Sequence, residues 1–194
     1  MRASAAQGWL FVISGVLGAA ASAILLIERI RLLEEPGSTL ACDINPFVAC
    51  APVMTSPAAS IFGFPNPIFG LVCFTVIVTT GVVLISGIGL PRWYWGALAV
   101  GAVLAGILIS WLQYQSMTVI GALCIWCMLV WAATIPLVVT IVGVALARAD
   151  VLGRRGATVG RGLLRYRPSI IAVWYLAVLA ALVVTFLDDL LAAL

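Results

Sequence analysis

The chain has no histidine, no lysine and very little charge of either sign. Only 9% of its 194 residues are charged, whereas ordinary globular domains carry about a quarter. The absence of histidine removes the commonest metal ligand and the commonest general base. All ten basic residues are arginines, and a net charge of +3 is too small to indicate nucleic-acid binding. Any catalysis must therefore use thiols, hydrogen-bonding side chains or a bound cofactor.

Long apolar runs take the place of the missing charge. Hydrophobic residues make up 64% of the chain, and five runs are long enough to cross the hydrocarbon of a bilayer, which takes about 20 residues. Each run must be helical, because lipid offers no partner for free backbone amides. The first run is too long for a cleaved signal peptide, so we expect it to be retained. The sequence predicts an all-α integral membrane protein with spans at about 8–27, 67–86, 93–114, 121–147 and 170–187.

We divide the chain into three parts. Residues 1–147 are expected to form a four-helix catalytic core with an outer cap loop at 28–66. Residues 148–168 form an Arg-rich cytoplasmic loop, and residues 169–194 form the fifth transmembrane helix with a short outer C-terminus. Arginines near spans stay on the cytoplasmic side, and in a five-span protein Arg2, Arg92 and the arginines of 148–168 fall on one side. The N-terminus is then cytoplasmic, and the opposite, outer side holds the acids Glu34, Glu35, Asp43, Asp188 and Asp189.

Four of the five cysteines form two pairs on the outer side. Cys42 and Cys50 are separated by seven residues that include the turn signal Asn45-Pro46. Cys124 and Cys127 form a Cys-Ile-Trp-Cys motif at the start of the fourth span, where the positive end of a helix favours a reactive thiolate. All four share an oxidising compartment, in which disulfides persist. The alternatives are a purely structural disulfide in the cap and two buried thiols that act as small apolar residues.

Three further side chains deserve notice. Asn66 is the strongest hydrogen-bonding group at the beginning of the second span, and it could bind a quinone carbonyl or cap the helix before Pro67. Trp131 lies one turn beyond Cys127 and could donate its indole N–H to a ligand or simply pack. Cys73 has no sequence partner, and we expect it to pack within the second span.

Together these residues resemble the bacterial members of the vitamin K epoxide reductase family. The similarity rests on Cys-Asp-Ile-Asn-Pro-Phe-Val-Ala-Cys, on Ser-Pro-Ala-Ala-Ser-Ile-Phe-Gly-Phe-Pro-Asn-Pro and on the CxxC motif of the fourth span, in that order along the chain. It covers about residues 8–147. The resemblance implies a four-helix bundle around a quinone of the menaquinone or ubiquinone type, capped on the outer side by the first loop.

The resemblance also implies a role for each paired thiol. Cys127 would reduce the quinone, and Cys124 would be its exchange partner. Cys50 would attack Cys124, and Cys42 would take electrons from a protein outside the membrane.

Three more positions follow from the same resemblance. Asn66 matches the family's hydrogen-bond donor to the quinone carbonyl. Trp131 stands where the vertebrate enzymes carry a tyrosine donor, and Ser60 lies near a small polar position of the cap.

Our leading hypothesis is a thiol:quinone oxidoreductase of the bacterial inner membrane that supports disulfide bond formation. The chain ends soon after its fifth span, so it resembles the unfused members, which would need a separate extracytoplasmic thioredoxin-like protein as partner. One alternative is a vitamin K quinone or epoxide reductase proper. A second membrane disulfide-oxidase family has its CxxC motif early and its spaced pair late, so the order of thiols argues against it. A Cys-based metal-binding membrane protein is a different class, and the lack of histidine argues against it.

Overall fold

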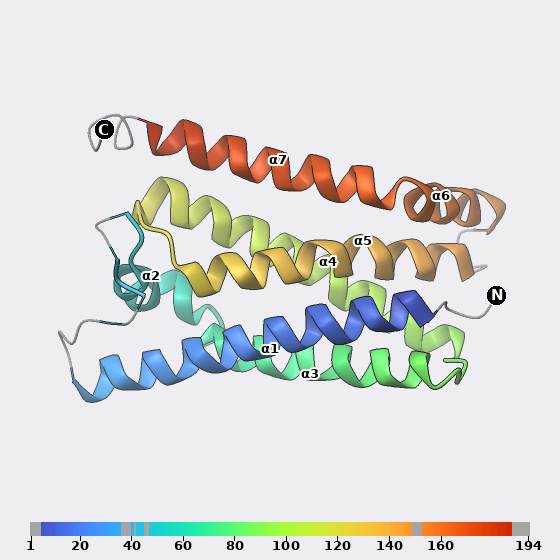
Figure 1. Cartoon of the computed structure of the whole chain (residues 1–194), viewed down its shortest axis with the longest axis horizontal. Coiled ribbons are helices and arrows are strands. Elements are labelled where there is room, and N and C mark those ends of the chain that lie inside the picture. Colours follow the sequence, from blue (N-terminus) through green and yellow to red (C-terminus); the bar gives the residue numbers. More distant parts are fainter. Residues whose placement is uncertain (1–4, 36–39, 41, 45–46, 149–152, 188–194) are drawn as a thin grey trace.

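The fold is a bundle of long helices that run roughly along one common direction (Figure 1). The computed structural model describes residues 5–35, 40, 42–44, 47–148 and 153–187. Within these ranges five helices are long and apolar enough to cross a membrane, which confirms the predicted all-α membrane class. They are α1 (Ala5–Glu34), α3 (Asn66–Ile85), α4 (Arg92–Gln115), α5 (Ile125–Arg148) and α7 (Arg167–Thr185). Our expectations for Arg2, Asn45-Pro46 and residues 188–194 lie outside the described residues.

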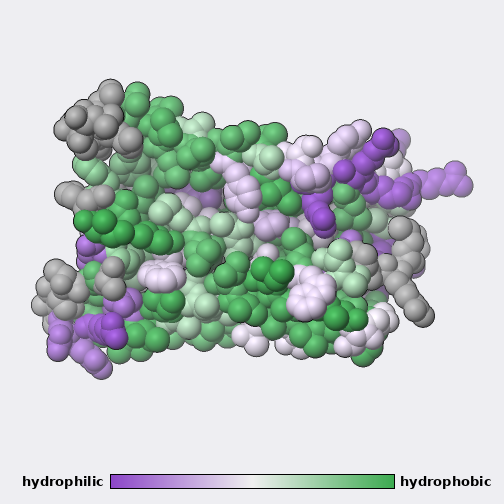
Figure 2. All heavy atoms as spheres, in the orientation of Figure 1, coloured by the Kyte–Doolittle hydropathy of each residue, from purple (hydrophilic) through white to green (hydrophobic). Residues whose placement is uncertain are grey.

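The two ends of the bundle differ in their polar groups. One end, here named the cap end, carries the short helix α2 (Cys50–Thr55) and the 3₁₀ turn η1 (Pro57–Ser60). The opposite end, named the arginine end, carries the beginning of α1 and helix α6 (Gly153–Arg165). On the face that Figure 2 shows, apolar side chains cover most of the length of the bundle, and the most hydrophilic ones gather at its ends. This distribution is the one a membrane-spanning bundle requires.

Two helix boundaries differ most from the sequence-based expectation. Helix α1 continues to Glu34, past the predicted limit of its apolar run. Helix α5 begins at Ile125 rather than at Gly121. The reason is local, because α4 passes into a π-helical turn, η2 (Ser116–Ile120), that ends at Gly121 with a left-handed φ of 66°. Glycine adopts that conformation without strain, so the chain turns there and the next helix starts later.

The Arg-rich stretch, which we expected to be a loop, contains helix α6. This helix packs on the end of α5, and at Gly160 the two backbones come so close that a Cβ would lie 2.3 Å from the backbone N of Ala147. Leu164 packs against the buried cluster of the bundle, whereas Arg154, Arg155, Arg161 and Arg165 are exposed. Our expectation weighed the charge of this stretch and overlooked its helical periodicity.

Helices α1 and α3 are antiparallel and pack through small residues. A Cβ at Gly81 would lie 2.8 Å from the backbone O of Gly8, and a Cβ at Gly18 would lie 2.3 Å from the ring of Phe74. Small residues let membrane helices approach closely, which maximises van der Waals contact where no hydrophobic effect operates between helices and lipid. The pair α1–α3 therefore forms a rigid side of the bundle.

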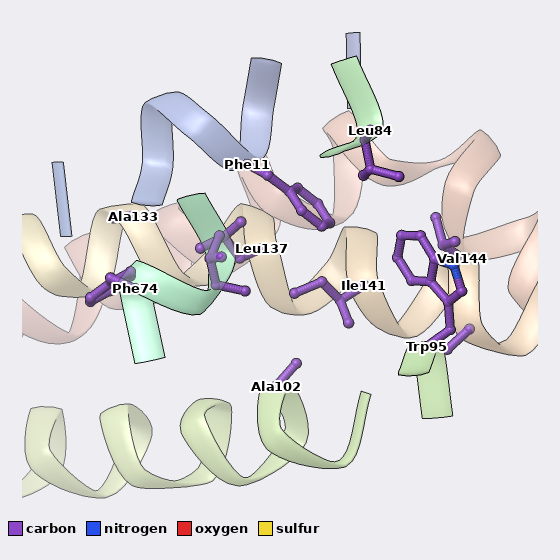
Figure 3. Close-up of a cluster of buried hydrophobic side chains, with 11 residues drawn as sticks. Phe11, Phe74, Leu84, Trp95, Ala102, Ala133, Leu137, Ile141 and Val144 are labelled. Carbon is purple, nitrogen blue, oxygen red and sulfur yellow. The ribbon is translucent and has the colours of Figure 1, made fainter. Parts of the chain in front are cut away.

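Buried side chains from α1, α3, α4 and α5 form a cluster that Figure 3 shows around Phe11, Trp95 and Ile141. Near the arginine end Thr80 of α3 and Tyr94 of α4 are hydrogen-bonded at 2.5 Å. Apart from this region α3 and α4 do not pack closely, whereas α1 packs along α3 and α5, and α4 packs along α5. The bundle is therefore open between α3 and α4.

The substitution Gly81→Ala tests the α1–α3 contact. It places a methyl group against the backbone of α1, so we expect it to lower stability by about 1–3 kcal/mol, as overpacking does. Gly96→Ala is the control, because no atom lies within 4 Å of a Cβ at Gly96. Thermal unfolding in detergent micelles measures both. Equal unfolding midpoints for the two variants would contradict the close contact.

Candidate functional site

A short backbone bridge joins the cap to the beginning of α5. Val48 and Leu123 form a parallel β-bridge, and the N–H of Leu123 donates to the carbonyl O of Phe47 at 2.8 Å. Both strands of the bridge run directly into a cysteine, Cys50 on one side and Cys124 on the other. The bridge thus sets the register of the two cysteine pairs.

The sulfurs of the two pairs lie side by side. Cys42 and Cys50 form a disulfide, with their Cα atoms 5.8 Å apart. Cys124 and Cys127 are thiols, and the Sγ of Cys124 lies 3.1 Å from the Sγ of Cys50. At that distance a thiolate at Cys124 would be in contact with the disulfide sulfur that it could attack. The structure therefore brings together the four thiols that the sequence analysis singled out.

These sulfurs are shielded from solvent. Cys50 and Cys124 are fully buried, and Cys42 is 4% exposed. They pack in one apolar cluster that includes Leu25 of α1 and Met54 of α2. Exchange between Cys50 and Cys124 would therefore occur away from water.

Asp43 organises the cap around the disulfide, a role that the sequence analysis missed. Its Oδ1 accepts hydrogen bonds from the backbone N–H groups of Cys50 at 2.7 Å and Ala51 at 3.2 Å, and its Oδ2 accepts one from Leu40 at 3.1 Å. The N–H groups of Cys50 and Ala51 belong to the first turn of α2. Such N–H groups have no carbonyl partner within their own helix, and Asp43 supplies an acceptor for both. A carboxylate next to Cys42 and seven positions before Cys50 could have signalled this contact, since Asp commonly binds nearby backbone amides.

The pKa of Cys124 is lowered from its ordinary value. The main cause is a hydrogen bond from the side chain of Cys127, and the backbone N–H groups of Cys127 and Trp126 add to it. Burial and the negative charge of Asp43 oppose the shift. Hydrogen-bond donors at the start of a helix stabilise a thiolate in this way. Of the two thiols, which share one hydrogen bond, Cys124 therefore ionises more readily than Cys127.

A cavity of about 760 Å³ extends from the cap end toward the arginine end. It lies beside the open α3–α4 side of the bundle, and Cys127 and Trp131 of α5 line it. Most of its wall is apolar, and polar atoms lie mainly near the cap. The polar and aromatic lining residues near the cap include Arg29, Ser56, Phe62, Asn66, Gln115 and Ser116. A long apolar cavity with a few polar groups at one end suits an amphiphilic ligand with a lipid-like tail.

Asn66 serves the cap and the cavity together. Its Nδ2 donates to the carbonyl O of Ala58 at 2.7 Å, and its Oδ1 accepts the N–H of Ile61 at 3.2 Å. The side chain does not cap α3, whose N-cap residue is Pro65. One amide hydrogen remains after the bond to Ala58, because the NH₂ group carries two. Asn66 can therefore hold η1 and still donate into the cavity.

The remaining predicted positions divide between the wall of the cavity and its surroundings. Trp131 is 5% exposed and lines the cavity. Ser60 does not line it, whereas Ser56, one turn earlier, does. Cys73 lines the cavity as well and is exposed rather than packed inside α3. Sequence position alone could not distinguish Ser56 from Ser60, because the choice depends on how η1 folds over α3.

Arg29 is a lining residue that the sequence analysis overlooked. Its guanidinium donates to the carbonyl O of Met54 and so ties α1 to α2.

In the part of the chain that the structure describes, no group of three or more Cys, His, Asp or Glu side chains could hold a metal ion.

Comparison with known proteins agrees with this site. A family model described as the vitamin K epoxide reductase family matches residues 9–142, which is more than half of the chain and includes all four paired thiols. No curated protein matches the chain.

Replacement of Asp43 tests its hold on the cap. In a chain with Cys42→Ala and Cys127→Ala, Cys50 and Cys124 remain as the adjacent pair. We expect Asp43→Ala to slow their oxidation to a disulfide by about tenfold, because α2 loses charge-assisted hydrogen bonds. Non-reducing gels after mild oxidation measure the rate.

Two further variants control this experiment. Asp43→Asn keeps one acceptor oxygen and should slow oxidation less. Glu35→Ala removes an exposed carboxylate of the same end and should leave the rate unchanged. A rate unaffected by Asp43→Ala would contradict the assigned role.

The pKa of Cys124 can be tested by removing its main hydrogen-bond donor. In protein that keeps the Cys42–Cys50 disulfide, Cys127→Ala should raise the pKa of Cys124 from its lowered position. At pH values between the two midpoints less thiolate will then be present. The ultraviolet absorbance of the thiolate, recorded against pH, gives the midpoint. Cys73→Ala is the control, and a midpoint that moves down in Cys127→Ala would refute the assignment.

Proposed function

The chain belongs to the vitamin K epoxide reductase family, whose members are membrane oxidoreductases that act on quinones, and we propose that it is a thiol oxidase that forms disulfides at the expense of a quinone. The observation that carries the proposal is the 3.1 Å separation of the Cys50 and Cys124 sulfurs, with Cys127 on the wall of the cavity. A continuous route for thiol–disulfide exchange thus runs from the cap disulfide to the cavity.

The first exchange takes place at the cap. A dithiol protein attacks the Sγ of Cys42, and the Cys42–Cys50 bond breaks. The second thiol of that protein resolves the mixed disulfide, so the partner leaves oxidised and Cys42 and Cys50 are reduced. Two electrons and two protons have then passed to the chain.

The second exchange moves the electrons inward. The Cys50 thiolate attacks the Sγ of Cys124 in a Cys124–Cys127 disulfide, and Cys127 leaves as the thiolate. Cys42 then attacks Cys50, which restores the cap disulfide and releases Cys124 as a thiol. The state with a Cys42–Cys50 disulfide and two thiols at Cys124 and Cys127 follows this step. The lowered pKa of Cys124 helps it both to leave and to attack in thiol exchange. A thiol of low pKa is a better leaving group, and it is present as the attacking thiolate at a lower pH.

The residues around the cavity fit a quinone. A bound quinone supplies a two-electron, two-proton acceptor that is soluble in lipid. Asn66 has a free amide hydrogen for a carbonyl at the cap end, and Trp131 presents an indole near Cys127 on the same helix. The apolar length of the cavity suits a prenyl tail, and the open side between α3 and α4 gives such a tail a path to lipid.

The arginines support an orientation with the cap outside the cell. Arg92 and the arginines of α6 lie at the end of the bundle opposite to the cap, and such residues favour the cytoplasmic side. The disulfide of the cap then faces the oxidising compartment on the outer side of a bacterial inner membrane. The partner proposed there is a thioredoxin-like protein that is itself a disulfide donor to other proteins.

Serine substitutions at the inner pair test the proposal. We expect Cys124→Ser and Cys127→Ser each to lower dithiol-driven reduction of a prenylated naphthoquinone by about 1,000-fold, because no other group replaces the nucleophile. Cys73→Ser is a matched control, since Cys73 lines the same cavity and belongs to neither pair. Retention of full quinone reduction in either of the first two variants would sink the proposal.

A trapped complex distinguishes the oxidase from a quinone or epoxide reductase with another donor. In Cys50→Ser the lone Cys42 thiolate attacks the disulfide of the oxidised partner and forms a mixed disulfide, and the partner's second sulfur leaves as a thiolate. Rapid acid quenching and alkylation of that thiolate keep the partner attached. We expect mass spectrometry of that complex to identify a thioredoxin-like protein.

A further inference from the structure

Helix α5 contains a proline in its interior, at position 136. Proline has no N–H, so the carbonyl of Ala132, four positions earlier, has no donor within its own helix. Lipid supplies none, and an unpaired carbonyl at membrane depth is costly. A donor must therefore come from outside α5.

Helix α7 supplies that donor. The phenol of Tyr175 donates to the carbonyl O of Ala132 at 2.6 Å. This bond is specific in position, because every neighbouring carbonyl of an uninterrupted helix is already engaged. Tyr175 thus completes the hydrogen bonding of α5 at the one place where Pro136 interrupts it.

The same face of α7 packs behind the cavity. Ile171 and Trp174 lie against a buried cluster of Ile109, Trp131 and Ile135, which Cys127 also contacts. Trp131 therefore lines the cavity and belongs to the buried cluster on which α7 packs. No residue of α7 itself is buried, so this face provides its attachment to the bundle while the rest is left to lipid.

From this arrangement we infer that Tyr175 is a positioning residue, and that α7 holds the Cys127–Trp131 wall of the cavity in the geometry that binds the quinone headgroup. The inference rests on the proposed function for its ligand, but the hydrogen bond on which it depends does not. Helix α7 lies outside the matched residues 9–142, so the family match does not assign it this role. A membrane anchor without such a role would tolerate the loss of the phenol.

A double-mutant cycle tests the hydrogen bond itself. Pro136→Ala restores a backbone N–H at position 136, which can donate to Ala132 and makes the phenol unnecessary. Tyr175→Phe should lower the thermal midpoint in the parent chain and should have little effect in the Pro136→Ala background. Tyr114→Phe is the control, because Tyr114 is 59% exposed on α4 and its removal breaks no comparable contact. Equal effects of Tyr175→Phe in both backgrounds would overturn the inference.

Binding and kinetics test the positioning role. With a prenylated naphthoquinone as the probe, we expect Tyr175→Phe to raise KM about threefold to tenfold with kcat within about twofold, the range expected for one interhelical hydrogen bond. The apparent Kd from quenching of tryptophan fluorescence should rise in parallel, and Pro136→Ala should rescue both values. Suppose instead that Tyr175→Phe lowers stability only in the presence of Pro136 but leaves KM and Kd unchanged. The role of α7 would then be structural alone, and the inference would be overturned.

The two proposals fail in different ways. If the parent chain does not reduce the naphthoquinone, the proposed function fails, and the stability cycle together with quenching still decides the role of Tyr175. If the parent chain is active but Tyr175→Phe lowers stability equally with and without Pro136→Ala, the inference fails and the proposed function stands.

Discussion

The parallel bridge between Val48 and Leu123 is the contact on which the site depends. A membrane bundle can place its helices by apolar packing, but that packing leaves the register of loops at its end undetermined. Here one backbone hydrogen bond sets the register of these loops. The N–H of Leu123 requires an acceptor, and the carbonyl O of Phe47 accepts it. Each bridge residue is followed within two positions by a cysteine, so a single register fixes the approach of Cys50 to Cys124. A slip by one residue would turn the sulfur away, since extended chain alternates its side chains.

The bundle is rigid on one side and open on another. Glycines along α1 and α3 bring those helices into backbone contact, whereas α3 and α4 diverge and leave the cavity between them. The thiol of Cys127 and the indole of Trp131 project from α5, which is the most buried of the spans. A firmly packed helix next to a side open to lipid suits the proposed quinone, which could enter and leave without displacing the thiols. Tyr175 adds a further constraint at the point where Pro136 weakens that helix.

The sequence was informative wherever the physics is local. Length and hydropathy predict the five spans, because each span is dictated by its own composition. The order and spacing of the cysteines indicate the site without reference to the fold. The sequence was less informative where a residue has two possible partners. Asn66 binds the backbone of η1, and only the folded cap reveals this. Ser56 replaces Ser60 in the wall for the same reason, and the donor for Ala132 comes from a helix 43 positions away. No local pattern contains such information.

The burial of the cap disulfide limits which reductants can reach it. A sulfur that is 4% exposed offers almost no surface to an attacking thiolate, however reactive that thiolate is. In the proposed oxidase, small thiols in the surroundings would thereby be kept from reducing the cap disulfide. A partner of the proposed oxidase would therefore have to expose Cys42 as it binds, so recognition would precede thiol exchange.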